Sequence, residues 1–234
     1  FPTAAGLASS SSGLAAMTLA CLDCAGGTPL ADRTLASRIA REGSGSAARA
    51  LWGGFTRWAR GADAAEALHG PEFWPELRVL VLVVSGRAKP LGSREAMEHA
   101  RLTSSSWDSW IAGEANIASR AQTSLAARDL GALGTVMRES YLAMFATMFT
   151  SRPAVIYWLP QSIGLLHLAA DLRAAGIPVW ETMDAGPQVK LFTIASAVED
   201  VRAAVSRGFP EVQVLESRPG SGPRPRNGHG PGSR

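Results

Sequence analysis

The stretch from Leu77 to Ser85 limits the fold more than any other part of this chain. It is a β-branched and almost uninterrupted apolar run, which is typical of a strand that is buried on both faces. The preceding Gly70-Pro71 and its polar surroundings predict a loop. We therefore expect a domain to begin near residue 76, with this strand inside its sheet.

Further helices and strands are predicted on both sides of this run. The predicted helices are 14–22, 31–42, 93–103, 111–130, 133–149, 160–175 and 197–206, and the predicted further strands are 179–182, 189–194 and 212–215. Strands and helices do not alternate strictly, which favours an α+β fold. Repeated Gly, Pro and Ser in residues 218–234 predict a disordered tail.

Composition excludes several classes of protein. The 234 residues are 46% hydrophobic and 18% charged, as in a soluble globular protein and unlike a disordered, collagenous or coiled-coil chain. No apolar stretch approaches the ~20 residues of a membrane helix. The net charge of +3 includes four arginines in 218–234, so the rest is electrically balanced. A nucleic-acid-binding surface or a membrane partner is therefore not expected.

Cys21 and Cys24 form a single C-x-x-C inside an apolar, helical pattern. A second Cys or His pair that would complete a zinc site is missing from the sequence, so we expect ordinary buried thiols. Reduced thiols fit the cytoplasm. The segment from Phe1 to Ala25 lacks the basic start of a signal peptide, and the first residue is not Met, which suggests that the natural N-terminus is missing.

Three segments carry residues suited to chemistry. The first, Phe1 to Gly13, is a small-residue loop that leads into a helix, an arrangement that aims backbone N–H groups at a phosphate. The P-loop consensus is absent, because no Gly-Lys-Ser/Thr follows. On composition alone, a Gly/Ser segment of this kind is more often an ordinary loop.

The second segment runs from Ser37 to Arg49 through a Gly-Ser turn. Ser44, Ser46 and Arg49 are spaced so that two hydroxyls and a guanidinium can converge on one anion. A helix cap with a surface arginine is the simpler alternative. In the third segment, Asp184 precedes Ala-Gly-Pro between two predicted strands, where Asp is usually a turn former.

These strings resemble those of mevalonate diphosphate decarboxylases, which belong to the GHMP kinase superfamily. The first segment resembles the family's Phe-Pro-Thr-Ala-Ala-Gly-Leu-Ala-Ser-Ser. The second resembles its Gly-Ser-Gly-Ser-Ala-Cys-Arg-Ser, in which Ala48 replaces the Cys and Ala50 the last Ser. The third resembles its Asp-Ala-Gly-Pro-Asn, in which Gln188 replaces the Asn. Residues 84–97 are similar to a segment ending Ser-Ser-Thr-x-Gly-Met, which places Ser93 on the family's active-site serine and Arg94 where relatives often carry Thr. Phe145 replaces the His of a frequent Phe-His-Ala-Thr.

The resemblance implies a two-domain GHMP kinase fold. Residues 1–75 would be the remainder of an N-terminal ATP-binding domain like domain 2 of ribosomal protein S5, with its first strands missing. Residues 76–217 would be a ferredoxin-like C-terminal domain, followed by the tail 218–234. A homodimer is implied as well.

The implied reaction is ATP-dependent decarboxylation of mevalonate 5-diphosphate to isopentenyl diphosphate, with ATP and Mg²⁺. The implied catalytic residues are Asp184, Ser93 and Arg49; the substrate-binding residues are Ser44, Gly45, Ser46, Ala47, Ala48, Arg49 and Arg94; the ATP-binding residues are Gly6, Leu7, Ala8, Ser9 and Ser10, with Ser9 or Ser10 near Mg²⁺. Alternatives are a decarboxylase or kinase acting on mevalonate monophosphate or bisphosphate, and a non-catalytic remnant. Because strands are expected to be missing, we expect the isolated chain to be inactive.

Overall fold

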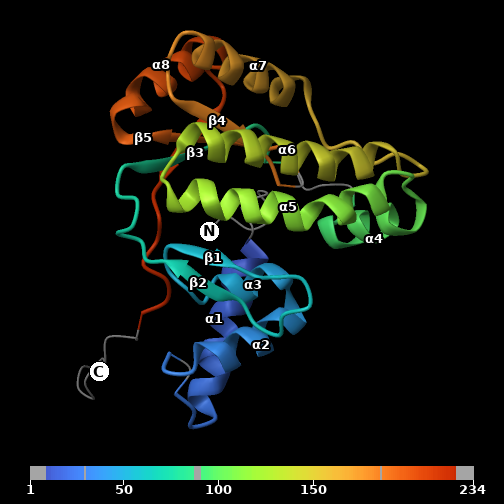
Figure 1. Ribbon diagram of the computed structural model, residues 1–234, viewed down its shortest axis with the longest axis vertical. Coiled ribbons are helices and arrows are strands. Elements are labelled where there is room, and N and C mark those ends of the chain that lie inside the picture. The colour runs from blue at the N-terminus through green and yellow to red at the C-terminus, as the bar shows by residue number, and fades with distance from the viewer. Residues whose placement is uncertain (1–8, 29, 87–90, 185, 225–234) are drawn as a thin grey trace. The chain divides into compact units, whose positions relative to one another are not determined.

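The computed structural model describes residues 9–28, 30–86, 91–184 and 186–224, without the side chains of Ser9 and Ser10 (Figure 1). The chain divides into two compact units. Among the described residues, one unit consists of residues 9–75 together with 219–224, and the other of residues 76–218. Each unit is described by itself below.

The first unit contains three helices and a small β-hairpin. The helices are α1 (Ser9–Cys24), α2 (Arg33–Gly43) and α3 (Gly45–Arg49), and the antiparallel strands are β1 (Phe55–Arg57) and β2 (Glu66–His69). Asp32 starts α2 because its carboxylate accepts a 2.9 Å hydrogen bond from the backbone N–H of Leu35. The core of this unit is built mostly from alanines, which let the three helices pack closely; its buried members are Ala15, Ala36, Ala40, Ala47 and Leu51.

Two predictions for α1 were wrong. The helix begins at Ser9 and not after Gly13, so five of the residues expected in a loop, 9–13, are helical. Cys21 and Cys24 are exposed, although we expected buried thiols. At ~100° per residue around a helix, Cys24 lies opposite Ala15 and Cys21 lies about 120° from it. Ala15 is on the side of α1 that packs on α2 and α3, so both cysteines point away from that core. The short strands β1 and β2 were not predicted at all.

The second unit is built on a four-stranded antiparallel sheet in the order β4-β5-β3-β6. Its strands are β3 (Leu77–Val83), β4 (Val179–Thr182), β5 (Val189–Ile194) and β6 (Gln213–Ser217). Helices separate β3 from β4 and β5 from β6, which gives the β-α-β-β-α-β chain order and the strand order of ferredoxin-like domains. The α+β prediction is confirmed, and the apolar run that begins at Leu77 is one of the two central strands.

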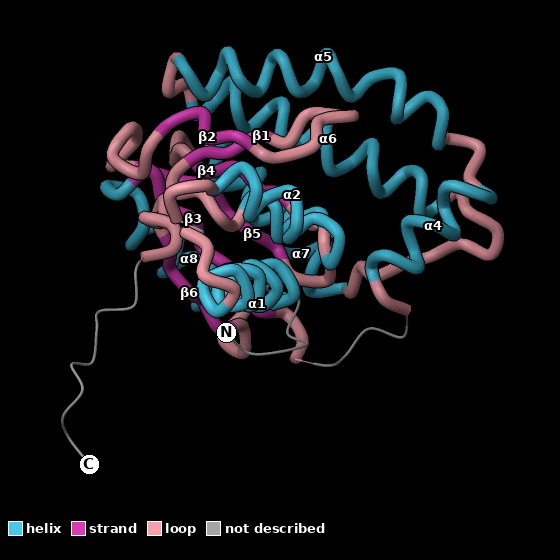
Figure 2. Tube along the Cα trace, turned by 90° about the horizontal axis from the view of Figure 1, so that it is seen from below, coloured by secondary structure: helices cyan, strands magenta, loops and turns pink. Residues whose placement is uncertain are grey.

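Five helices complete this unit, and all were predicted to within a few residues. They are α4 (Ser93–Thr103), α5 (Trp107–Ala126), α6 (Leu130–Phe149), α7 (Pro160–Ala174) and α8 (Val198–Gly208). Helices α5 and α6 lie side by side (Figure 2), joined by an Arg120–Glu139 ion pair of 2.7 Å. Helices α7 and α8 cover one face of the sheet, where the main core gathers. None of the helices in the described ranges is both long enough and apolar enough to cross a membrane.

The edge strand β4 is fastened to its neighbours by a buried carboxylate. Glu181 is fully buried and pairs with Arg173 Nη1 at 2.5 Å and with Arg138 Nε at 3.3 Å. Tyr141 donates a further hydrogen bond to it, and burial together with the charge of Glu181 raises the pKa of Tyr141, so the phenol stays a neutral donor. The strand that leads to Asp184 is therefore held to both α6 and α7.

The segment predicted as a disordered tail is described only in part. Residues 219–224 contain no helix or strand, and the backbone N–H of Gly54 donates a 2.8 Å hydrogen bond to Gly220 O. Residues 225–234 lie outside the described residues. The prediction of disorder for this tail stays a prediction.

Candidate functional site

In the first unit, the start of α1 lies next to the serine turn, residues 44–46, that joins α2 to α3. Ser44 ends α2 and precedes α3 in an extended conformation, and its Oγ lies 3.0 Å from the Oγ of Ser46. Ser11, in the first turns of α1, donates a 2.9 Å hydrogen bond to Ser46 O. The structure thus brings together two of the segments that the sequence singled out. Both serines of the turn are half-buried, and neither is sealed from a ligand.

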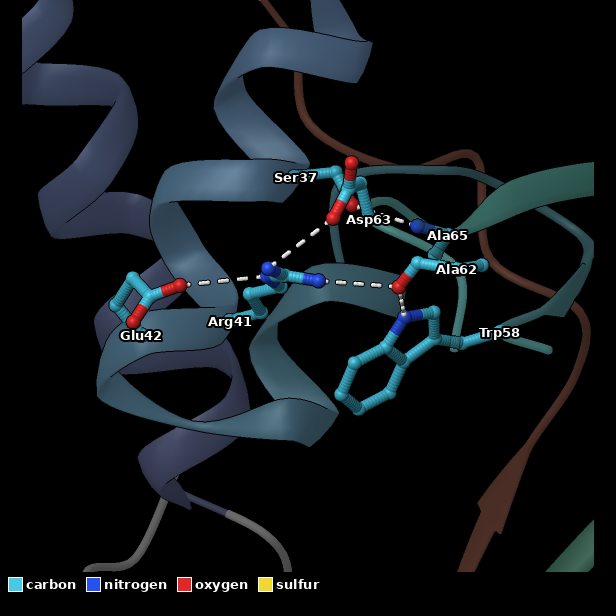
Figure 3. A network of polar contacts seen from close by, with 7 residues as sticks. All are labelled: Ser37, Arg41, Glu42, Trp58, Ala62, Asp63 and Ala65. Atoms are coloured by element: carbon cyan, nitrogen blue, oxygen red, sulfur yellow. Dashed lines mark hydrogen bonds and ion pairs between the residues drawn. The ribbon is translucent and has the colours of Figure 1, made fainter. Parts of the chain in front are cut away.

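Gly45 is required in this turn because an indole ring lies against it. A Cβ atom at position 45 would stand 2.6 Å from Cζ3 of Trp58. The ring is held in turn, since Trp58 Nε1 donates to Ala62 O at 2.9 Å. Arg41 donates to the same carbonyl at 3.0 Å and pairs with Asp63 at 3.3 Å. Figure 3 shows these groups converging on Ala62.

A buried serine ties the same loop to α3. Ser37 is fully buried on α2, and its Oγ donates a 3.0 Å hydrogen bond to Ala48 O. The same Oγ accepts a 2.9 Å hydrogen bond from the backbone N–H of Ala65 (Figure 3). The hydroxyl therefore fixes α3 and the start of the β2 segment to one helix. Ser37, Arg41 and Trp58 were not predicted as supporting residues, and the one signal for them in the sequence is a polar residue on the apolar face of α2.

The remaining residues of the predicted substrate loop differ in exposure. Arg49 is exposed at the end of α3, and its guanidinium is available to a ligand. The side chains of Ala47 and Ala48 are fully buried, so these two positions present backbone groups only. The small residues predicted here are needed by the core as much as by a ligand.

In the second unit, Asp184 lies in the turn between β4 and β5, as predicted. Gln188 ends this turn and is buried. Its Oε1 accepts from Val84 N at 2.6 Å and its Nε2 donates to Ser85 O at 2.6 Å, so the amide extends the β3–β5 ladder beyond the last backbone pair. Ser162 on α7 donates a 2.7 Å hydrogen bond to Pro187 O. Gln188 in place of the family's Asn thus has a defined role.

Tyr157 connects the Asp184 turn with the residues that precede Ser93. Its hydroxyl donates a 2.8 Å hydrogen bond to Leu91 O, and its Cβ would be 3.3 Å from a Cβ at Gly186. Phe145, in place of the family's His, is fully buried and packs edge-on against Trp158 at 5.0 Å. Phe145 is therefore part of the apolar core beneath the turn.

The three predicted site residues of this unit, Ser93, Arg94 and Asp184, are exposed. Ser93 and Arg94 are the first residues of α4, and both are exposed. The Asp184 side chain is 68% exposed and pairs with the ammonium of Lys190 on β5. Lys190 was not predicted, because a single lysine in an apolar strand gives no sign in the sequence of what it contacts.

Two of the predicted groups cannot be placed in full. Gly6, Leu7 and Ala8 lie outside the described residues, and of Ser9 and Ser10 only the helical backbone is described. Within the described ranges there is no group of three or more His, Cys, Asp or Glu side chains that could hold a metal ion.

Family models match both units of the chain. Residues 1–69 match the diphosphomevalonate decarboxylase-like N-terminal domain, and residues 79–224 match the mevalonate 5-diphosphate decarboxylase C-terminal domain. The chain belongs to the mevalonate 5-diphosphate decarboxylase family. The resemblance seen in the sequence motifs is thereby confirmed.

Individual members of the family agree with this assignment. Diphosphomevalonate decarboxylases of Bos taurus and Homo sapiens are 35% and 36% identical to the chain over 90% of its length. The chain spans about half the length of these curated relatives, 54% of each. A solved structure of MDDEF in complex with MVAPP, AMPPCP and magnesium superposes with a TM-score of 0.87 at 34% identity, covering 95% of this chain and 68% of that one. The Staphylococcus aureus enzyme gives 0.85 at 32% identity, covering 94% and 68%.

Proposed function

We propose that this chain is part of an enzyme that decarboxylates mevalonate 5-diphosphate to isopentenyl diphosphate at the expense of ATP. The observation that carries the proposal is the hydrogen bond between Ser11 and Ser46 O, because it joins the helix of the phosphate motif to the serine turn in a chain whose two units both match the decarboxylase family. A solved relative is described in complex with MVAPP, AMPPCP and magnesium, which supports the same substrates here.

In this proposal the serine turn and Arg49 anchor the substrate. Ser44 and Ser46 offer hydroxyls that already lie 3.0 Å apart, and Arg49 is exposed beside them in the sequence. A guanidinium binds phosphate or carboxylate oxygens through two parallel hydrogen bonds, which fix orientation as well as charge. Trp58 and Ser37 hold the backbone of this turn, so its geometry exists before the substrate binds.

ATP would bind at the start of α1, with Gly6 to Ser10 around its phosphates. The positive end of a helix and consecutive small residues suit a phosphate. Ser9 or Ser10 would complete the coordination of Mg²⁺, which neutralises phosphate charge when bound. Ser93 and Arg94, at the start of α4, would contact the transferred phosphoryl group or the substrate diphosphate.

Asp184 would act on the C3 hydroxyl of the substrate. As the hydroxyl oxygen attacks the γ-phosphorus, the bond to the β-γ bridging oxygen breaks, ADP leaves, and the hydroxyl proton passes to the carboxylate. The C3–O bond of the phosphorylated intermediate then breaks with loss of phosphate. The electron pair of the C1–C2 bond forms the new double bond as CO₂ departs. The exposed carboxylate and its fixed turn backbone suit a group that must meet a substrate.

The proposal includes a homodimer in the cytoplasm. Light scattering coupled to size-exclusion chromatography of the full-length gene product, and fractionation of cells that express it, test these two statements.

Turnover of three substrates tests the main proposal. The full-length gene product is supplied with MgATP and mevalonate 5-diphosphate, mevalonate 5-phosphate or mevalonate 3,5-bisphosphate, and the products are identified by mass spectrometry. We expect isopentenyl diphosphate from the first substrate. Preferred turnover of either other substrate would assign the protein to a related decarboxylase or kinase, and a lack of turnover with all three would support a non-catalytic remnant.

A further inference from the structure

The backbone around Asp184 is fixed, whereas its side chain is not buried. Ser162 holds Pro187 O, and Gln188 is bonded to the end of β3. Met183, directly before Asp184, is buried at 3% exposure. The Asp184 side chain is nevertheless 68% exposed. Fixed Cα atoms alone do not orient an exposed carboxylate, because its χ angles remain free to change.

A lysine at the other end of the turn supplies the missing constraint. Lys190 Nζ contacts Asp184 Oδ2. Lys190 is the second residue of β5 and stands opposite Val81 on β3 and Thr182 on β4. The Lys190 side chain is only 21% exposed. Because β5 is hydrogen-bonded on both sides, the base of this side chain cannot shift with the turn.

The position of Lys190 is unusual for a charged residue. Alternation along β5 places Phe192 and Ile194 on the same face as Lys190, and Val81 is its cross-strand neighbour there. A lysine among half-buried apolar residues keeps its ammonium solvated by extending its stem to the edge of the apolar surface. Here the ammonium of Lys190 ends at the carboxylate of Asp184.

We propose that Lys190 is the positioning residue for Asp184, and the proposal rests on the decarboxylase function proposed above. The ammonium holds Oδ2 of Asp184 and selects one side-chain conformation. Oδ1, which has no hydrogen-bond partner within the described part of the chain, is left to accept the proton of the C3 hydroxyl. A reacting group held in one orientation reacts faster than one that must first find it, and misplacement by ~1 Å can cost as much as ~10²-fold in rate.

A double-mutant cycle in the full-length gene product tests this role. Lys190→Gln keeps a long polar side chain and removes the charge, and Lys190→Arg restores the charge. We expect Lys190→Gln to lower kcat about 10- to 100-fold while the KM values for substrate and ATP change by less than about threefold, since the contact that is lost orients a base and does not bind substrate. In the Asp184→Asn background the same substitution should cost less than about threefold, because no base remains to be oriented. Lys190→Arg should recover much of the loss.

Arg202→Gln is the matched control. Arg202 lies on α8 of the same unit and pairs with Glu216 at 2.9 Å; the two side chains are 34% and 39% exposed. The Arg202→Gln substitution should leave both kcat and KM unchanged. The cycle is measured with whichever phosphorylated mevalonate the wild-type enzyme turns over.

Each outcome decides between the two proposals. An unchanged kcat in Lys190→Gln, a rise in KM alone, or an equal loss in the Asp184→Asn background would overturn the positioning role while the decarboxylase function stands. If the wild-type enzyme turns over none of the three substrates, the proposed function and the role of Lys190 are both overturned.

Discussion

Replacing Gly45 by alanine tests whether the serine turn is held in place by the ring of Trp58. The added Cβ would lie 2.6 Å from Cζ3 and 3.3 Å from Cη2 of that ring. Carbon atoms pack at about 3.5–4.0 Å, so the ring or the turn must move by about 1 Å. Movement of the ring stretches the 2.9 Å hydrogen bond from Trp58 Nε1 to Ala62 O. Both routes disturb the turn that carries Ser44 and Ser46.

The change in stability caused by Gly45→Ala is the cost of overpacking minus the gain in helix propensity. Overpacking in a well-packed site costs about 1–3 kcal/mol. Alanine recovers a part of this in a helix, up to about 1 kcal/mol in the interior and less at the first residue, which Gly45 is. We expect a net destabilisation of about 1–2 kcal/mol, which lowers the local protection of the α2–α3 region by a factor of about 5–30.

Amide hydrogen exchange is the suitable assay because the chain has two units, and exchange reports each region separately. Exchange is measured on the full-length gene product, together with KM for mevalonate 5-diphosphate. Gly13→Ala is the matched control: it lies in α1 of the same unit, and a Cβ there meets nothing within 4 Å, so helix propensity should leave the protein equally or more stable. In a Trp58→Phe background, which shortens the ring, Gly45→Ala should cost less. If Gly45→Ala behaves like Gly13→Ala in both exchange and KM, the ring does not hold the turn.

Three further substitutions have defined expected outcomes. Arg49→Ala should raise KM for the substrate by about 10- to 100-fold, since hydrogen bonds to charged groups contribute about 1.5–3 kcal/mol, and Lys should rescue it only in part; wild-type kinetics would show that this loop does not bind the substrate. Asp184→Asn should lower the single-turnover rate at saturating MgATP and substrate by about 10²- to 10⁴-fold, whereas a rate within about threefold of wild type would leave Asp184 as a turn residue only. Ser37→Ala should destabilise the first unit by about 2–5 kcal/mol, because Ala48 O and Ala65 N both lose their buried partner; faster exchange of the Ala65 amide measures the loss, and unchanged protection there would contradict it.

The second unit could be predicted largely from the sequence, because its elements carry strong local patterns. The strands at Leu77, Val179 and Val189 are apolar and bounded by turns, and the structure starts them at these residues. Helices α4 to α7 are each at least three turns long and contain no proline after their first residue. Where propensity, pattern and turn chemistry agree, the local sequence determines the element.

The first unit was predicted less well, since its structure depends on contacts between distant residues. Strands β1 and β2 have three and four residues, too few for alternation to be recognised. Helix α1 is apolar on nearly all sides, so the sequence could not say which side packs, and Cys21 and Cys24 were placed on the wrong one.

For the candidate site, motifs indicated the residues that would touch a ligand, but they did not indicate the residues that hold these ligand-contacting residues in place. Trp58 meets Gly45 across thirteen residues of sequence, and Gln188 meets Ser85 across 103. Such pairings follow from the fold and leave no local pattern. Lys190 is predictable as a strand residue, yet its contact with Asp184 depends on the conformation of the turn between them.

The product balance of a single reaction tests the central claim most directly. The full-length gene product is given mevalonate 5-diphosphate labelled with ¹³C at C1 and a limiting amount of MgATP, and ADP, phosphate, labelled CO₂ and isopentenyl diphosphate are quantified together. The account predicts equal amounts of all four products, and none of them when ATP is left out. Formation of ADP without labelled CO₂, or release of labelled CO₂ without ATP, would contradict it.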